Sequence, residues 1–461
     1  MSGSKAVRVA GTGARLIGGL ALSAACVAGV VVAVPMTLPG VQSTPAQTSV
    51  TPYPGDTLLT CAGPFRAVGR DATNATQQST AGVPVIVSGA DGTALQEETI
   101  ATPDLADNPE TTWFLGVPEN REPAQIAAAE SVDIRSDDLA GFAAASCREP
   151  SMESWIVGGA ATTGASDILL VANPSEVTAT VTFTVYGAQG TSKSQTVIPA
   201  RTQRSIPLAE GAAGESSPVV QVTVSGAPVR AALQSSLIRT LDPAGIDLQD
   251  GVVRPDTSLQ LLGVRAVLAS TADAASTKLR LLAPTADADV TIRARAAADG
   301  AAAGDPIDVS IEAGLPSEVD LSMLQPGLYS IEIEASAPVV AAAWQTTAIG
   351  KGADFAWMTS APELRGTTTF AVADGPQPQV QLTNAGDAAI EAVLTPLGAG
   401  EQRIEVPAHG SAMIDVAAGT VYTLESEGAL RAAVSYLGTG QIAGYPVHPT
   451  SKASQPIVVT Q

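Results

Sequence analysis

Histidine and cysteine, which often carry acid–base or nucleophilic chemistry, are scarce in this chain. It has two histidines, His409 and His448, and three cysteines. His409 falls in a turn whose equivalents in two other repeats hold Arg201 and Gly314, and His448 stands between prolines; both are expected to face solvent. No Gly-x-Ser-x-Gly, His-Glu-x-x-His or P-loop sequence is present. The sequence therefore predicts no catalytic residue, no cofactor and no complete set of metal ligands.

Carboxylates are the abundant reactive groups, with 45 Asp and Glu residues. A glycosidase needs only two carboxylates, about 5–10 Å apart. The acids fall mainly at turns and strand ends, for example Asp287, Asp299 and Asp387, where solvation explains them. The run Asp242–Gly251 lacks the alternating Asp spacing and distal Glu of a calcium-binding EF-hand loop. We therefore predict that the protein is not an enzyme.

Two tryptophans are the candidate contact residues. Trp344 follows a strand whose core face carries Val339, Ala341 and Ala343, so its ring belongs to the opposite face. If Trp344 and Trp357 are exposed, they are possible glycan or partner contacts, because an aromatic ring can stack on a sugar. The alternative is that both rings seal the joint between the second and third repeats.

Two of the three cysteines are expected to form a disulfide bond. Cys26 lies inside a long apolar run, whereas Cys61 and Cys147 lie in the part of the chain expected to be exported. Disulfides form in oxidising compartments. A Cys61–Cys147 bond would close a ring of 87 residues, worth roughly 4–5 kcal/mol in the chain-entropy description. The alternative is two separate buried thiols.

The first 54 residues read as a membrane segment and a stalk. Residues 1–15 are basic, and residues 16–34 are uncharged and mostly apolar; as a helix they would span roughly 28 Å, about the thickness of the hydrocarbon core. The preceding basic residues keep the N-terminus in the cytoplasm. Residues 16–34 are thus a single-pass membrane anchor or, alternatively, a cleaved signal peptide that would leave the protein secreted. Residues 35–54 form a Pro-rich stalk.

The charge of the chain excludes one class of partner. Its net charge is −21, and after residue 34 it has 21 basic against 45 acidic residues. Such a surface repels phosphate backbones, so nucleic acid is not expected as a partner.

The rest of the chain repeats one β pattern. Thr178–Gly187 alternates Thr with apolar residues, and related strand-like segments follow at about 100-residue intervals, at Val290–Ala296 and Ile390–Gly398. The pattern predicts an N-terminal β domain and three β modules, followed by a tail: 55–150, 151–240, 241–349, 350–449 and 450–461.

We predict an all-β fold of tandem immunoglobulin-like β-sandwich modules, each with six or seven short strands. A β-propeller-like arrangement is the alternative. The pairs Asp56/Pro64, Asp247/Pro255 and Asp354/Pro362, each eight residues apart, suggest that the N-terminal region opens like the later modules. Residues 123–130 are compatible with a short helical turn.

Several segments together resemble a known family. They are Cys61-Ala-Gly-Pro64, Cys147-Arg-Glu-Pro150, Trp155-Ile-Val-Gly-Gly159, Leu170-Val-Ala-Asn-Pro174 and the stretch 354–362. On these segments the chain resembles an actinobacterial family of uncharacterised exported proteins, one of the domains of unknown function. The resemblance implies a role in the cell envelope, because such genes tend to lie beside a membrane glycosyltransferase.

Three functions follow as hypotheses. The first is a membrane-anchored extracytoplasmic scaffold of the envelope, partnering a membrane glycosyltransferase or an envelope polysaccharide in glycan assembly. The alternatives are a polysaccharide-binding protein that uses Trp344 and Trp357, and an envelope hydrolase.

Overall fold

The computed structural model describes residues 4–33, 47–50, 53–71, 73–74, 76–119, 122–267, 277–348, 350–449 and 457–460. The helix α1 (Ser4–Ala33) contains an apolar stretch, residues 15–32, that is long enough to cross a membrane. The short strands β1 (Gln47–Val50) and β32 (Ile457–Thr460) pair antiparallel. They lie within the predicted stalk and tail, where the sequence indicated no strand. Most other residues of the stalk and tail lie outside the described residues.

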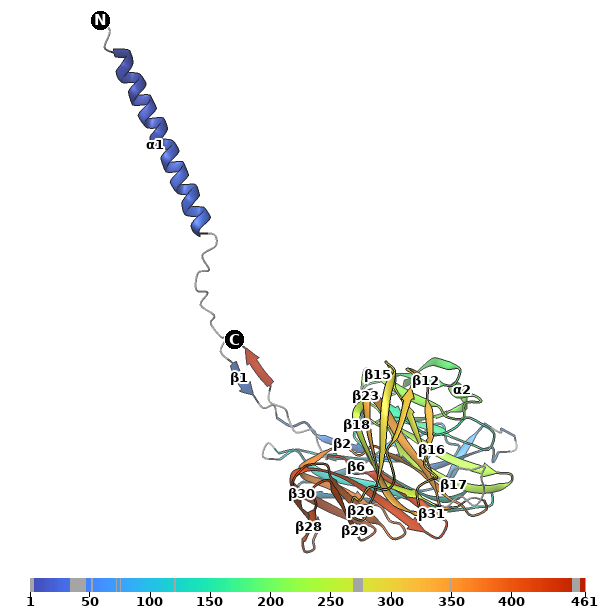
Figure 1. Ribbon diagram of the computed structural model, residues 1–461. Helices are drawn as coiled ribbons and strands as arrows, with labels where there is room; N and C mark the ends of the chain where they lie inside the picture. The colour runs from blue at the N-terminus through green and yellow to red at the C-terminus, as the bar shows by residue number, and fades with distance from the viewer. Residues whose placement is uncertain are drawn as a thin grey trace. The chain divides into compact units, whose positions relative to one another are not determined.

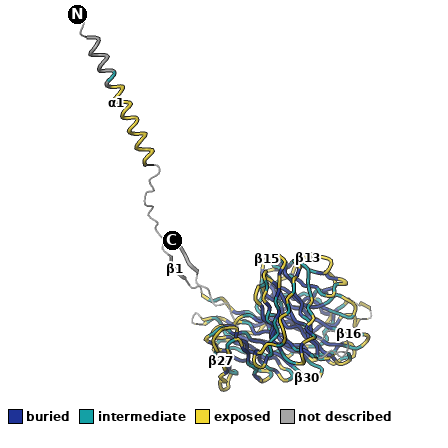
Figure 2. Tube along the Cα trace, viewed as in Figure 1, coloured by how far each residue is buried: buried dark blue, intermediate teal, exposed yellow. Residues whose placement is uncertain are grey.

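Residues 53–454 form a separate compact unit that consists almost entirely of β-strands (Figure 1). This confirms the predicted all-β class. Its buried residues fill the interior of the strand layers, and the exposed ones lie at the rims and loops (Figure 2). The N-terminal region of this unit contains β2 (Thr57–Thr60), β3 (Phe65–Val68), β4 (Gln78–Gly82), β5 (Val85–Asp91), β6 (Leu95–Ala101), β7 (Glu110–Gly116), β8 (Gln125–Arg135) and β9 (Ala140–Ser146).

The expected helical turn at residues 123–130 is instead part of β8. This segment is rich in alanine, which favours helix locally. As a strand, however, it pairs with β5 on one side and β9 on the other, and its alanines enter hydrophobic cores on both faces of the sheet. Tertiary packing therefore overrides the local preference.

Three further segments repeat one order of strands. Module 1 contains β10 (Glu153–Ile156), β11 (Ile168–Asn173), β12 (Ala179–Gly187), β13 (Gly190–Ile198), β14 (Thr202–Pro207), the single helical turn α2 (Ala209–Ala212), β15 (Val219–Ser225), β16 (Arg230–Arg239) and β17 (Asp242–Asp250). Module 2 contains β18 (Asp256–Ala266), β19 (Thr277–Leu282), β20 (Ala288–Ala296), β21 (Ile307–Ile311), β22 (Ser317–Asp320), β23 (Gly327–Thr346) and β24 (Phe355–Thr359). Module 3 contains β25 (Leu364–Val372), β26 (Gln379–Asn384), β27 (Ile390–Pro396), β28 (Gln402–Val406), β29 (Gly410–Asp415), β30 (Thr420–Gly438) and β31 (Gln441–Pro446).

Each module is built from two antiparallel sheets around its own core. In module 3 the sheets have the orders β28–β27–β30–β25 and β29–β26–β30–β31, so the 19-residue strand β30 belongs to both. The 20-residue strand β23 does the same in module 2. In module 1 this path is broken into β15 and β16 near Gly226, whose φ of +95° does not fit a strand. The long shared strand was not predicted from the sequence.

Equivalent turns in the modules use equivalent side chains. The side-chain amide of Asn173 donates to three backbone carbonyls of module 1 at 2.8–3.2 Å, and Asn384 does the same in module 3 at 2.7–3.2 Å. Arg201, Gly314 and His409, which the sequence aligned, all have positive φ. His409 is thus a turn residue; its side chain is 58% exposed and lies 2.9 Å from Asp387.

The last strands of modules 1 and 2 lie beyond the predicted module limits at residues 240 and 349. The strand β17 pairs with β16, and β24 pairs with β23. By strand pairing, module 1 therefore ends at Asp250 and module 2 at Thr359. The predicted equivalence of Asp56 with Asp247 and Asp354 also fails, because Asp56 is exposed before β2 whereas the other two are buried.

These last strands bring the four parts of the unit together. The strand β9 of the N-terminal region packs against β17, β17 against β24, β24 against β31, and β31 against β9. They close a ring of four strands, one from each part, as the innermost strands of propeller blades do. The fold therefore combines two-sheet modules with a propeller-like ring of strands. The sequence analysis gave a propeller-like arrangement only as the alternative to tandem sandwich modules.

The carboxylate of Asp354 lies at the centre of this ring. It accepts hydrogen bonds from the backbone N–H groups of Phe142 (2.9 Å), Ile246 (3.0 Å) and Ile442 (3.1 Å), which belong to β9, β17 and β31. Gly141 and Gly245 leave the space for it, because a Cβ on either would come within 2.7 Å of an Asp354 oxygen. One buried side chain thus joins module 2 to the other three parts.

Candidate functional site

A cavity lies at the joint between modules 1 and 2, and we call it the tryptophan cavity. Its volume is about 540 Å³. Module 2 contributes charged and aromatic side chains to its wall, and module 1 contributes several serines together with Asp167 and Arg239. The lining residues used below are Asp167, Ser217, Arg239, Lys278, Arg280, Glu318, Trp344, Phe355 and Trp357.

Cross-strand register builds the wall from module 2. Trp344 on β23 lies opposite Trp357 on β24 and opposite Lys278 on β19. Residues directly opposite each other in an antiparallel pair point to the same face, so these three side chains share the face turned to module 1. Arg280 and Phe355, each two residues along its strand, lie on that face too. Trp344 stacks on Phe355 with ring centroids 6.3 Å apart.

Arg280 bridges the two modules. Its guanidinium donates to the carbonyl oxygens of Gly159 (2.8 Å), Pro218 (3.0 Å) and Ser216 (3.2 Å), all in module 1. It also pairs with Glu318 on β22 at 2.9 Å and lies over the ring of Trp357, 4.7 Å from the centroid. Because all five N–H donors of Arg280 are used in this way, it fixes the shape of the cavity rather than contacting a ligand.

The wall from module 1 carries the buried carboxyl group of Asp167 and the guanidinium of Arg239. Asp167 accepts a hydrogen bond from the backbone N–H of Ala160 at 2.6 Å. Burial raises the pKa of Asp167 to about 7, against the hydrogen bonds it accepts and the charge of Arg280. Arg239, at the end of β16, makes no side-chain hydrogen bond or ion pair with the residues that the structure describes.

This arrangement favours the binding of a polar ligand that has flat apolar faces. Aromatic side chains supply contact area, and the surrounding charged and hydroxyl groups supply hydrogen bonds. Lys278 is 41% exposed and makes only a long 3.4 Å ion pair with Glu318. Together with Arg239, it gives the cavity donors that the protein itself does not fully use.

Comparison with known proteins places the chain in a family. Residues 104–426 match a family of unknown function, DUF5719. The chain belongs to this family. The matched residues include both walls of the tryptophan cavity and end within β30. No curated protein and no solved structure shows a significant match to the chain.

The two tryptophans differ in exposure in this DUF5719 member. Trp357 is only 6% exposed and packs with Trp155 and Val157 of module 1, whereas Trp344 is half-buried. The sequence left open that both rings seal the joint between modules 2 and 3. Trp357 does seal a joint, but it is the joint between modules 1 and 2, because β24 turns its outer face to module 1.

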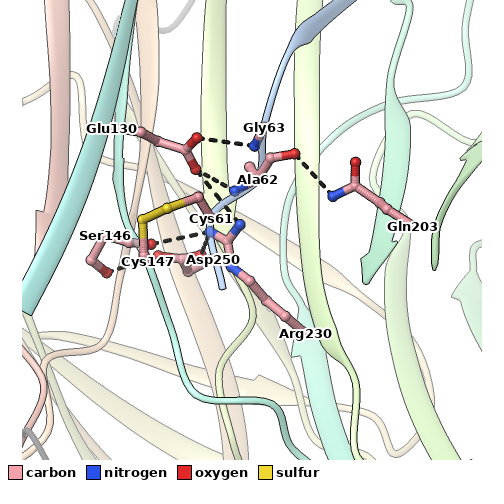
Figure 3. Close-up of a disulfide and its surroundings, with 9 residues drawn as sticks. All are labelled: Cys61, Ala62, Gly63, Glu130, Ser146, Cys147, Gln203, Arg230 and Asp250. Atoms are coloured by element: carbon pink, nitrogen blue, oxygen red, sulfur yellow. Dashed lines mark hydrogen bonds and ion pairs between the residues drawn. A yellow bond between two sulfur atoms is a disulfide. The ribbon is translucent and has the colours of Figure 1, made fainter. Parts of the chain in front are cut away.

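The predicted disulfide between Cys61 and Cys147 is confirmed, and both residues are buried (Figure 3). The carboxylate of Glu130 lies beside the two sulfur atoms and accepts hydrogen bonds from the backbone N–H groups of Ala62 and Gly63. The two sulfurs and Glu130 would have the spacing of metal ligands. In the disulfide, however, the sulfurs are bonded to each other and are not thiolates.

Several buried ionisable residues were missed from the sequence. The acids were expected at solvated turns, yet Glu130, Asp167, Asp247 and Asp354 are all buried. The prediction that His448 faces solvent is wrong, because its Nε2 atom is buried in a second cavity. Local sequence could not show this, since strands far apart in the sequence pack around these groups, as when Ile246 of β17 and Ile442 of β31 donate to Asp354.

Proposed function

We propose that this protein is an extracytoplasmic, membrane-tethered binding protein of the cell envelope, and that its tryptophan cavity holds a segment of an envelope polysaccharide. One observation carries the proposal: Trp344 and Phe355 form an aromatic wall in a cavity that also holds the donors of Lys278 and Arg239. This is the chemistry that sugar rings need, with apolar faces and a rim of hydroxyls. The scaffold role expected from the sequence is compatible with it, and a membrane glycosyltransferase remains the proposed partner.

Removing Trp344, the more exposed of the two tryptophans, tests the binding site. The full chain in detergent would be screened on a glycan array, and the affinity for the best oligosaccharide measured by calorimetry. We expect Trp344→Ala to weaken binding about tenfold, since one stacking contact is worth about 1–1.5 kcal/mol. Trp357 is unsuited to this test because Arg280 rests on its ring.

The matched control is Met323→Ala. Met323 is also an exposed large apolar residue, at 64%, and does not line the cavity. This variant should bind as the wild type does. Equal affinities for wild type and Trp344→Ala, or no oligosaccharide bound at all, would rule out the proposed site.

A hydrolase is the second candidate, because the cavity holds two carboxylates of contrasting acidity. Burial raises the pKa of Asp167 to about 7. Burial also acts to raise the pKa of Glu318, but the charge and hydrogen bonds of Arg280 hold it below its usual value. A general acid and a carboxylate base need this contrast. Release of reducing ends from the bound oligosaccharide by the wild type, but not by Asp167→Asn, would favour this candidate over simple binding.

The location is proposed from α1 and the disulfide. An apolar helix at the N-terminus suits a membrane anchor or a signal peptide, and a disulfide suits an oxidising compartment. We expect the helix to remain as an anchor. Intact-mass measurement of the protein from membrane fractions should then include residues 4–33. A mature protein that begins after residue 33 and occurs in the medium would show cleavage and secretion instead.

A further inference from the structure

A second cavity, of about 200 Å³, lies where the N-terminal region and modules 1 and 3 meet. Its walls include residues from all three, among them Ser151 of module 1 and Tyr445 of β31. Two nitrogen-bearing side chains line it, Arg148 and His448. We call it the Arg148 cavity. It contains none of the residues of the tryptophan cavity.

The backbone holds Arg148 in place. Its N–H and C=O groups form two 2.9 Å hydrogen bonds with Thr60. Thr60 and Arg148 are the direct neighbours of Cys61 and Cys147, so the disulfide fixes the same point from the adjacent residues. The guanidinium is therefore presented to the cavity from a rigid support.

The guanidinium of Arg148 has no protein partner among the described residues. Its Nη1 atom is buried without a hydrogen bond, and no ion pair is formed with a described carboxylate. Burial lowers the pKa of Arg148 to about 10, although the charges of Asp250 and Glu149 act to raise it. At neutral pH it is still a cation. A cation that keeps a buried nitrogen without a hydrogen bond is costly, which calls for an explanation.

Two nearby carboxylates, Asp250 and Glu130, pair with another arginine, whereas Glu149 lines the same cavity and its charge acts on Arg148 without a direct ion pair. Arg230 reaches between Asp250 and Glu130, at 2.5 Å and 3.6 Å (Figure 3). Asp250 also accepts a hydrogen bond from the Ser146 hydroxyl at 3.0 Å. This pairing balances the charge of Arg230 and leaves that of Arg148 uncompensated by a direct contact.

His448 adds a second unused group. Its Nε2 atom is buried and has no partner among the described residues. Burial and the neighbouring charge of Arg148 lower its pKa well below the usual value. The ring is therefore neutral, and its Nε2–H tautomer can donate one hydrogen bond without adding charge.

We propose that the Arg148 cavity is a binding site for a small organic monocarboxylate, held by the guanidinium of Arg148 and the imidazole of His448. The planar fork of an arginine matches a carboxylate in a bidentate pair. A monocarboxylate brings one negative charge to Arg148, whereas a phosphate dianion would bring a second one into a cavity that Glu149 also lines. The other walls include Pro150, Pro446 and Phe370, which suit an apolar body of a few carbon atoms.

Calorimetry on the full chain, with acetate, propionate and benzoate as probes, tests the site. We expect at least one of them to bind, with the uncharged methyl ester and inorganic phosphate at least tenfold weaker. Arg148→Met should abolish binding, and His448→Gln should weaken it several-fold because one donor changes. The same Arg148→Met variant should not lower the unfolding temperature of the ligand-free protein, since it removes an unpaired buried charge.

The control is Arg403→Gln, which alters an arginine that is 60% exposed in module 3 and pairs with surface carboxylates. It should leave carboxylate binding unchanged. The proposal is wrong if none of the three carboxylates binds at 10-millimolar scale, or if Arg148→Met binds them as the wild type does. A loss of binding equal in Arg148→Met and Arg403→Gln would also overturn it, because it would show only general charge attraction. Tighter binding of phosphate than of every carboxylate would replace the proposed ligand class.

Discussion

Replacing Asp354 by alanine is expected to destabilise the protein by about 3–9 kcal/mol, because it leaves three backbone N–H groups from three different parts buried without an acceptor. Each such group costs about 1–3 kcal/mol. A loss of this size is comparable with the whole stability of many domains. Urea unfolding of the full chain in a non-ionic detergent, followed by tryptophan fluorescence, would measure it.

The matched control for this prediction is Asp287→Ala. Asp287 also accepts a backbone hydrogen bond, from Ala313 at 2.8 Å, but it is exposed within a single module. Its replacement should cost less than about 1 kcal/mol. If the two variants unfold at the same urea concentration as the wild type, the ring is held together without Asp354.

The pH dependence of the unfolding free energy is a second test of the role of Asp354. Burial raises the pKa of Asp354 to about 7, although four backbone hydrogen bonds act to lower it. Between the unfolded value of 3.8 and about 7 the folded state therefore holds a proton that the unfolded chain has lost. Stability is greatest below this window and falls as the pH rises through it. Asp354→Asn should flatten the fall but not remove it, because burial also raises the pKa values of Asp167, Asp247 and Glu130.

Removing the disulfide is the second change with a large expected effect. The double variant Cys61→Ala/Cys147→Ala should lose about 4–5 kcal/mol, because the bond closes a loop with a sequence separation of 86 residues and so restricts the unfolded chain. Alanine is chosen so that no hydroxyl group is buried at these sites. Denaturant unfolding with and without a reductant would measure the loss.

Cys26→Ala is the control, since Cys26 is exposed on α1 and unpaired. It should not change the unfolding midpoint of the β unit. Reduced wild type should approach the double variant. A double variant as stable as oxidised wild type would mean that the contacts around Glu130 and Arg230 hold the loop without the covalent bond.

Local pattern was enough to predict the modules. Alternating Thr and Val residues predict half-buried strands, and their recurrence predicts repeated units. The alternation of side chains along a strand also predicted that Trp344 lies on the face opposite the core. The register of β23 with β24, which places Trp344 opposite Trp357, agrees with this prediction. The disulfide could also be predicted, because only two cysteines lay in the part of the chain expected to be exported.

The local pattern could not predict contacts between residues that are far apart in the sequence. Asp354 appeared in the sequence as one member of an Asp–Pro spacing shared with Asp56, yet only Asp354 reaches the amides of β9, β17 and β31. The helical turn expected at residues 123–130 failed for a similar reason, since β5 and β9 pair with that segment from both sides. Neither the donors nor the strand partners are close in sequence.

The sequence by itself determined the class of this protein: an apolar N-terminal segment, repeated strands of period two, one disulfide and an acidic surface. These properties depend on composition and on neighbours a few residues away. Only the tertiary structure decided which side chains lie together. It places Trp344 and Arg239 in one cavity and Arg148 and His448 in another. It also makes Asp354 the residue that joins the four parts. The physical reason is that burial and unsatisfied hydrogen-bonding groups arise only when segments about 100 residues apart pack together.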